Sequence, residues 1–186
     1  MRWIYTAILA CGCGGTVNNE FDAASASDSG PTADTAPAID SMSAAACNTD
    51  AAFLAAAPFT SLNSPQDESW AWFTPDMLTV YLSSARTDGA VGADDLYQAT
   101  RASVDDDFEL ELVPNLNTVE QEDSPVLTAD LRTIFYSVRT GAKPDWDIYT
   151  ATRSGVGVAF SDPELVLNIN DDDEHDFATW VNDDAT

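Results

Sequence analysis

Two acidic runs contain the side chains whose type and spacing could bind a metal. They are Asp105-Asp106-Asp107 and Asp171-Asp172-Asp173-Glu174-His175-Asp176. Calcium takes several oxygen ligands, but neither run fits the EF-hand loop, because the glycine that this loop requires is absent. We interpret both runs as solvated acidic loops between strands. If calcium binds, the candidate ligands are Asp171, Asp173 and Asp176.

The sequence contains few residue patterns that are typical of a catalytic site. His175 is the single histidine, so a Ser–His–Asp triad would have to use it. The chain has no G-x-S-x-G nucleophile motif. Gly155-Val156-Gly157 is half of a dinucleotide-binding fingerprint and reads more simply as a turn after a strand ending at Arg153. We therefore predict a non-catalytic protein that needs no cofactor, with calcium left open.

Tryptophans offer a second kind of candidate site, a face that stacks on sugars. The candidates are Trp70, Trp72, Trp146 and Trp180. Trp70 and Trp72 are two residues apart, which places them on one face of a strand. Core packing between structural units is the interpretation that we favour.

The elements that must position these residues come from an internal repeat. The segment 95–101 (DLYQATR) matches 147–153 (DIYTATR) at five of seven positions, with a spacing of 52 residues. Other matched positions agree with this period: Thr79 with Thr133, Phe108 with Phe160, and Asn63 with Asn117 and Asn170. A repeat of this length indicates stacked supersecondary units, each too small to bury its apolar face alone.

Within each unit the pattern predicts β-strands. Residues 79–83 (TVYLS) and 133–137 (TIFYS) are β-branched and aromatic runs of strand length. In the first unit we predict four strands, at about Trp70–Phe73, Thr79–Ser83, Asp95–Thr100 and Glu111–Val113. A four-stranded antiparallel unit at this period is typical of a β-propeller blade. The predicted fold class is therefore all-β, a partial β-propeller.

An arginine and an aspartate recur at the ends of successive predicted strands. They are Arg86 with Asp95 in the first unit and Arg139 with Asp147 in the second. A charge-assisted pair would join two strands of one unit. When exposed, such a pair contributes roughly 0–1 kcal/mol. We interpret these residues as structural pairs within a blade, not as ligand contacts.

The order of these motifs resembles the TolB-type, WD40-like β-propeller repeat, especially the versions found in bacterial envelope lipoproteins. The resemblance covers roughly residues 47–183. The family usually has Pro-Asp-Gly at the turn, where this chain has Pro75-Asp76-Met77 and Ala129-Asp130-Leu131. Without glycine a positive φ is less accessible, so we expect a looser turn or another turn type.

The resemblance implies a non-catalytic binding or scaffold module that engages protein partners of the cell envelope. Two alternatives stay open. The chain could be the propeller fragment of a larger serine-peptidase-like enzyme, which would require an α/β-hydrolase domain downstream. It could also be a calcium-dependent adhesion module that acts through the acidic loops.

The N-terminal segment resembles an export signal. Residues 1–11 hold one arginine and an apolar run that is too short to span a bilayer. Ile8-Leu9-Ala10-Cys11 resembles a lipobox, which makes Cys11 the candidate lipidation site; Cys13, with a poorer preceding context, is the second candidate. The segment 12–46 is rich in Ser, Ala and Asp and is predicted to be a disordered tether. We predict an exported protein, lipid-anchored on the periplasmic or outer-membrane side of the bacterial cell envelope; a plain disordered tail is the alternative.

The repeat region, 47–186, divides into a partial blade at 47–63, blades at 64–117 and 118–170, and the start of another at 171–186. We aligned Glu122-Asp123 with His175-Asp176 to place that last start. Propellers have four to eight blades, and this chain encodes about two and a half. We expect an incomplete or truncated propeller, or one that self-associates to complete its ring.

The charge excludes one class of partner. The formal net charge is −25, from 32 acidic and 7 basic residues, which is the wrong sign for binding a nucleic-acid backbone. A surface this acidic suits a salt-rich habitat, where ions screen the charges. Of the three cysteines, Cys47 alone lies in the predicted fold, so we expect neither a disulfide framework nor a cysteine zinc site.

Overall fold

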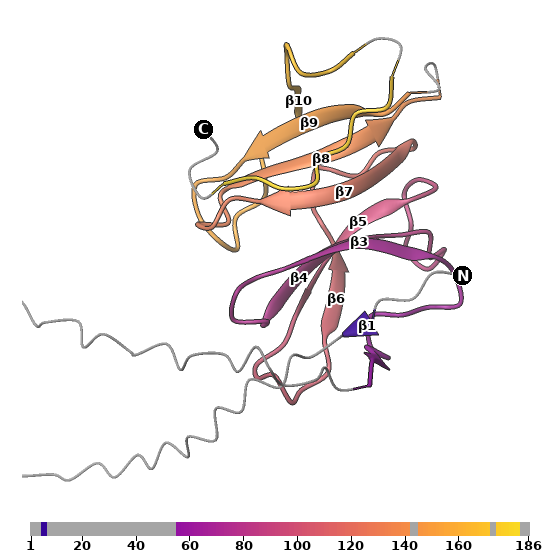
Figure 1. Ribbon diagram of the computed structural model, residues 1–186, viewed down its shortest axis with the longest axis vertical. Helices are drawn as coiled ribbons and strands as arrows, with labels where there is room; N and C mark the ends of the chain where they lie inside the picture. The colour runs from indigo at the N-terminus through magenta and orange to yellow at the C-terminus, as the bar shows by residue number, and fades with distance from the viewer. Residues whose placement is uncertain (1–4, 7–54, 142–144, 172–173, 183–186) are drawn as a thin grey trace, which may run out of the picture. The chain divides into compact units, whose positions relative to one another are not determined.

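The computed structural model describes residues 5–6, 55–141, 145–171 and 174–182 (Figure 1). Residues 5–6 and the described residues from 57 onward belong to one compact unit, whose structure is given below. Cys11, Cys47 and the tether at 12–46 lie outside the described residues, so the predictions made for them stay predictions.

The first sheet contains the four strands predicted for the first unit. They are β3 (Glu68–Phe73), β4 (Thr79–Ser84), β5 (Asp95–Thr100) and β6 (Glu109–Leu112), in the order β3-β4-β5-β6 with antiparallel neighbours. The central strands β4 and β5 are buried on both faces, which suits their β-branched and aromatic composition.

The second sheet repeats this arrangement. Its strands are β7 (Gln121–Leu127), β8 (Thr133–Arg139), β9 (Asp147–Thr152) and β10 (Glu164–Leu165), in the order β7-β8-β9-β10. A short pair, β1 (Tyr5–Thr6) with β2 (Ala57–Pro58), stands apart from both sheets. The prediction of an all-β fold with two four-stranded antiparallel units is confirmed, and the described residues contain no helix. The sheets do not close into a ring, and their assignment as propeller blades stays a prediction.

Both sheets carry a bulge at the same place in their first strand. The register against the next strand shifts between Ser69 and Trp72 in β3, and between Asp123 and Val126 in β7. Trp70 and Ser124, at the two shifts, have φ values of 48° and 56°. A bulge re-aims the side chain that it carries, and the Trp70 side chain is 46% exposed.

The main apolar core lies between the two sheets. Its buried residues are Tyr81, Leu96, Val113, Leu116, Leu127, Ile134, Tyr136, Val138, Ala151 and Phe160. Burial of one such side chain stabilises the fold by about 1.5–3 kcal/mol. A second cluster covers the opposite face of the first sheet, where Leu82 and Tyr97 lie beside Leu62 and Phe108. The first sheet is thus buried on both faces.

Main-chain hydrogen bonds also join the sheets. The loop before β5 runs beside the start of β7, where Ala93 N donates to Glu120 O at 3.1 Å and Glu122 N donates to Asp94 O at 2.9 Å. Asp94 and Gln121 form a parallel bridge at this point. The same contact recurs one repeat later, where Asp176 N donates to Trp146 O at 2.8 Å. The joint between repeats is therefore built from backbone as well as from side chains.

The turn between the first two strands of each sheet is tighter than we expected. Met77 and Leu131, which stand where the family has glycine, have φ values of 60° and 58°. The expectation of a looser turn is therefore wrong, because these residues adopt the left-handed conformation despite their side chains. Hydrogen bonds stabilise it: the N–H of Met77 donates to Thr74 O, and that of Leu131 to Thr128 O, both at 2.9 Å.

The aspartate in each turn adds further bonds. Asp76 Oδ1 accepts from Thr74 Oγ1 at 2.6 Å and from Leu78 N at 3.0 Å, which lowers the pKa of Asp76. Asp130 Oδ1 accepts in the same way from Arg132 N and from Thr128 Oγ1, and its pKa is also lowered. Accepting hydrogen bonds favours the charged form of a carboxylate.

The arginine that ends each repeated D-x-Y-x-A-T-R motif holds this turn from the other side. Arg101 Nε donates to Met77 O at 2.9 Å, and Arg153 Nε donates to Leu131 O at 2.7 Å. Each guanidinium lies 4.4 Å from the centre of a phenylalanine ring, Phe108 and Phe160 respectively. The recurrence of this arginine therefore has a structural cause.

Candidate functional site

An asparagine clamps the end of each sheet. Asn117 Oδ1 accepts from Leu96 N at 2.7 Å, and Asn117 Nδ2 donates to Leu96 O at 2.9 Å. Asn170 makes the same two bonds to Ile148, at 2.7 and 3.0 Å. The amide thus bonds both backbone groups of a strand residue, which explains why asparagine recurs at the repeat period.

A carboxylate follows each asparagine and caps the next loop. Ser64 N donates to Glu68 Oε2 at 2.9 Å, and Thr118 N donates to Glu122 Oε2 at 3.1 Å. Both glutamates are buried, at 2% and 0% exposure. A buried carboxylate requires such donors, because desolvation of an unpaired charge is costly.

The third member of this series is Asp176. Its Oδ2 accepts from Asp171 N at 2.7 Å, over five residues instead of four. The extra residue lets the shorter aspartate side chain meet the same kind of N–H donor. Since Asp176 N and Glu122 N donate to equivalent carbonyls, Asp176 is the counterpart of Glu122. Our alignment of Glu122-Asp123 with His175-Asp176 was therefore wrong by one residue.

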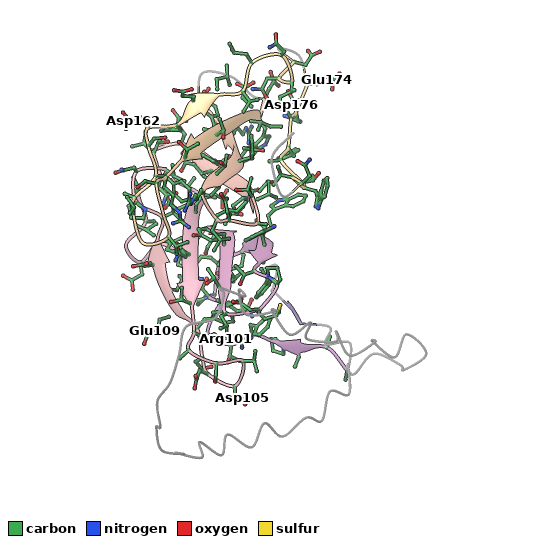
Figure 2. The ribbon with its side chains drawn as sticks, turned by 90° about the vertical axis from the view of Figure 1, so that its left-hand side faces the viewer. Arg101, Asp105, Glu109, Asp162, Glu174 and Asp176 are labelled. Atoms are coloured by element: carbon green, nitrogen blue, oxygen red, sulfur yellow. The ribbon has the colours of Figure 1, made fainter. Side chains whose placement is uncertain are left out.

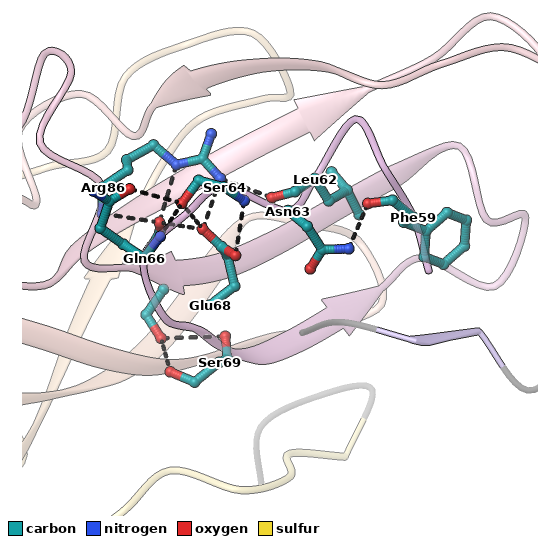
Figure 3. A network of polar contacts seen from close by, with 10 residues as sticks. Phe59, Leu62, Asn63, Ser64, Gln66, Glu68, Ser69 and Arg86 are labelled. Carbon is teal, nitrogen blue, oxygen red and sulfur yellow. Dashed lines mark hydrogen bonds and ion pairs between the residues drawn. The ribbon is translucent and has the colours of Figure 1, made fainter. Parts of the chain in front are cut away.

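Arg86 completes a polar network around Glu68 (Figure 3). Arg86 Nη2 donates to Leu62 O at 2.7 Å and lies 3.4 Å from Glu68 Oε1, and Arg86 Nε donates to Ser84 Oγ at 2.9 Å. The carboxylate that Arg86 contacts is thus Glu68 of β3. Asp95, the partner predicted from the sequence, is buried and accepts from the N–H groups of Val91 and Gly92, at 2.9 and 3.1 Å.

Arg139 does not occupy the position of Arg86. In the strand register, Glu68 lies opposite Ser84 and Glu122 lies opposite Val138, so Arg139 takes the place of Ala85. Arg139 Nη1 lies 3.5 Å from Gln121 Oε1 at the surface. Asp147 is buried at the start of β9. The pairing of Arg139 with Asp147 stays a prediction.

Glu122 therefore has a different set of partners from Glu68. Its carboxylate accepts from Thr118 N and from Thr118 Oγ1, at 3.1 and 2.5 Å, and Thr140 stands where the first sheet has Arg86. Burial raises the pKa of Glu122 to about 7; the Thr118 hydrogen bonds lower it, and the charges of Asp95 and Glu120 raise it. Glu122 is therefore a buried group that titrates near neutral pH.

A cavity of about 610 Å³ lies beside this network. Arg86 and Asp88 line it from the loop after β4, Tyr97 from β5, and Leu110 and Leu112 from β6. The Tyr97 hydroxyl is buried and makes no hydrogen bond within the described part of the chain. The Arg86 guanidinium lies 5.0 Å from the centre of the Tyr97 ring. In Figure 3 one terminal nitrogen of Arg86 carries no dashed contact. The cavity therefore offers hydrogen-bond donors in a partly apolar wall.

Two of the four tryptophans considered for a stacking face, Trp70 and Trp146, lie against one ring, that of Phe177. Trp70 stacks on Phe177, with ring centres 6.1 Å apart, and Trp146 lies 5.5 Å from the same ring. Trp72 packs on Tyr81 beside the main core, as we expected for a packing role. Trp180 is 77% exposed.

His175 lies near Phe177. Their ring centres are 6.4 Å apart. Gly155-Val156-Gly157 forms a turn after β9, where Val158 N donates to Gly155 O at 3.2 Å and Gly157 has a φ of 84°. The interpretation of this glycine pair as a turn is confirmed.

Two of the three predicted calcium ligands lie within the described residues. Asp171 and Asp176 meet through the hydrogen bond described above, and Asp173 lies outside the described residues. In the first acidic run, Asp105 and Asp107 are exposed and Asp106 Oδ2 accepts from Ser103 Oγ at 2.8 Å. Within residues 5–6, 55–141, 145–171 and 174–182, no three His, Cys, Asp or Glu side chains are grouped as metal ligands.

Comparison with known proteins gives the chain no family: no protein-family model and no curated protein matches it. The described residues form no helix of the length and apolar character that a membrane span requires. The residues that sequence reasoning missed are Glu68 and Glu122, together with the turn-holding role of Arg101 and Arg153. The repeated arginine was visible in the motif, but its carbonyl partner lies 22 to 24 residues away in the chain.

Proposed function

We propose that the chain is a non-catalytic binding and scaffold module of the bacterial cell envelope, built on TolB-type β-propeller repeats. The repeated strand order, bulge, turn and asparagine clamp support the propeller assignment. These repeated polar contacts within the chain hold the sheets in shape. The binding surface must then be a face that the sheets leave open.

One observation carries this proposal. The first sheet packs on the second through Tyr81, Leu96, Val113 and Leu116, all at most 2% exposed. The equivalent side chains of the second sheet are half-buried or exposed: they are Phe135, Ile148, Val166 and Ile169, and Ile169 is 55% exposed. The equivalence follows from the strand registers, from the asparagine clamps and from Val113 N and Val166 N, which donate to Leu96 O and Ile148 O.

We call the surface formed by Phe135, Ile148, Val166 and Ile169 the open face. Its residues are equivalent to those through which the first sheet packs on the second. Neighbouring Leu167 is 71% exposed, which extends its apolar area. Exposed apolar patches of this kind mark interaction sites. We take the occupant to be a protein partner of the cell envelope that presents an apolar β-sheet, packing on the second sheet as the second packs on the first.

Site-specific photocrosslinking in bacterial cells tests the partner. The whole chain carries a photoreactive phenylalanine at Ile169, in the open face, or at Val119, which is 81% exposed outside it. We expect one envelope protein to be crosslinked at Ile169 and not at Val119. Equal adducts at both positions, or none at Ile169, would contradict the proposal. Adducts between two copies of the chain would make self-association the function of this face.

The envelope location has its own test. We expect Cys11→Ser to release the chain from the membrane fraction, because a lipid on that sulfur is the proposed anchor. Cys13→Ser is the matched control and keeps the chain membrane-bound. If both variants fractionate alike, the lipid anchor on Cys11 is wrong.

A further inference from the structure

We propose that the free edge of β6 binds an extended basic peptide, which adds a fifth strand to the first sheet. β6 pairs with β5 on one side, with Leu112 opposite Tyr97 and Leu110 opposite Ala99. Val113 N donates to Leu96 O at 3.0 Å, so Leu96 and Val113 are a hydrogen-bonding pair. This site lies on the first sheet and is independent of the open face on the second.

The pairing pattern shows which backbone groups are free. Hydrogen bonding alternates along an antiparallel pair, so Glu109 and Glu111 direct their N–H and C=O groups toward β5. Leu110 and Leu112 direct theirs away from it. Within the described residues these two leucines have no partner on that side. An exposed row of such groups is a template for strand addition.

The cavity beside this edge adds a site for a side chain. Leu110 and Leu112 line the cavity together with Tyr97, which is 3% exposed and whose hydroxyl has no hydrogen-bond partner among the described residues. The second terminal nitrogen of Arg86 has no hydrogen-bond partner within the part of the chain that the structure describes. Leaving a buried polar group unsatisfied destabilises the protein. A small hydroxyl side chain, such as threonine, would relieve that cost by accepting from Arg86 or Tyr97.

Charge selects the sequence of the incoming strand. Glu109 and Glu111 are exposed and alternate with the two leucines, and exposed Asp88 lies at the cavity. Residues directly opposite each other on paired strands share a face, and opposite charges there are favourable. The peptide therefore places lysine or arginine opposite the glutamates and uncharged residues opposite the leucines. The net charge of −25 draws such a peptide toward the protein.

Hydrogen exchange with the whole chain tests this inference. The probe is acetyl-Lys-Thr-Lys-Val-Lys-Thr-amide, present at about ten times its dissociation constant. We expect the amide exchange of Leu110 and Leu112 to slow about tenfold, because exchange then requires dissociation. The amides of Glu109 and Glu111 already face β5 and should not change. Fast exchange of both leucines in the free protein is required; slow exchange there would mean that the edge is already paired.

Two N-methylated probes separate strand pairing from charge attraction. Methylation of the backbone nitrogens of Thr and Val removes the hydrogen bonds to β6 and should abolish binding. Methylation of the backbone nitrogens of the three Lys residues leaves charge and composition nearly unchanged and should preserve binding. Equal binding of the two probes would overturn the inference.

Protein variants give an independent readout. Glu109→Lys with Glu111→Lys should weaken binding, whereas Asp162→Lys with Glu174→Lys changes the net charge equally and should have little effect. Figure 2 shows Glu109 beside the first sheet, and Asp162 and Glu174 beside the second. If both double variants lost peptide affinity equally, the binding would be non-specific electrostatic attraction, and the strand-addition site would be wrong.

Discussion

Arg153 Nη2 of the second sheet donates a hydrogen bond of 3.0 Å to the hydroxyl of Tyr81 of the first. The Tyr81 hydroxyl donates in turn to Gln98 Oε1 at 2.7 Å. Burial raises the pKa of Tyr81, and Arg153 opposes this rise. The arginine that holds a turn within its own repeat thus also links two repeats.

Removing this hydroxyl should destabilise the fold. Tyr81→Phe deletes both bonds and leaves a buried guanidinium nitrogen unpaired, which costs about 1–3 kcal/mol. Urea unfolding measures the change in the free energy of unfolding. A double-mutant cycle with Arg153→Met isolates the pair, because Arg153 also bonds Leu131 O. Simple additivity of the two substitutions would show that the hydrogen bond contributes nothing.

Glycine at the turn should improve stability. Met77 holds a φ of 60°, a conformation that costs a non-glycine residue about 1 kcal/mol or more. We expect Met77→Gly to raise the free energy of unfolding by about 0.5 kcal/mol, after the larger chain entropy of unfolded glycine is subtracted. Thermal unfolding of the two proteins checks this.

The reverse change is the matched control. Gly89 has a φ of 76° and nothing within 4 Å of the position of an added Cβ. Gly89→Ala should therefore destabilise by about 1 kcal/mol through backbone strain alone. If both variants shifted stability in the same direction, the turn conformation would not be the cause.

Gly92 should tolerate no side chain. A Cβ there would lie 2.3 Å from Glu120 O and 2.5 Å from Thr118 O, both backbone atoms of the segment that precedes β7. We expect Gly92→Ala to cost about 1–3 kcal/mol, because the backbone must move apart. Circular dichroism with urea titration measures it. Gly155→Ala, with open space around its Cβ, should be close to neutral; equal losses at both positions would exclude the close approach as the reason.

Stability should fall with rising pH between about 4.5 and 7. Glu122 has a pKa of about 7 in the folded protein, above its ordinary value of 4.5, so the folded state binds its proton more tightly. The folded protein then binds more protons in this window, and ionisation at higher pH costs about 3 kcal/mol. Urea unfolding at pH 5 and pH 8 measures the difference.

Glu122→Gln should remove most of this dependence. The amide oxygen can still accept from Thr118 N, and the amide nitrogen can donate to Thr118 Oγ1, the two partners of the glutamate. The variant should match the parent at pH 5 and exceed it at pH 8. An unchanged pH profile would assign the dependence to other groups.

Much of the fold followed from the sequence because its signals were local. The runs at Thr79 and Thr133 have the composition of buried strands, and the asparagine series marks the clamps that end each sheet. In the first unit, four of the eight predicted strand ends match those of the structure, and the other four differ by one or two residues. The turn was mispredicted because the absence of glycine was given more weight than the bonds supplied by Asp76, Asp130 and the distant arginines.

The polar network was less predictable. Nothing in the composition distinguishes buried Glu68 and Glu122 from the many acidic residues at the surface. The equivalence of Arg86 and Arg139 failed because sequence spacing cannot show strand register, and a shift of one residue moves a side chain to the other face. The positions of Glu68 opposite Ser84 and of Glu122 opposite Val138 could be recognised only once strand pairing was known.

The main-chain joint between repeats has an evolutionary consequence. The bonds from Glu122 N to Asp94 O and from Asp176 N to Trp146 O do not depend on which side chains those residues carry. A duplicated copy of the unit could form the same backbone hydrogen bonds at its boundary before any substitution had occurred there. Lineages could therefore lengthen or shorten such an array by whole units, while the side chains of each copy diverged toward different ligands.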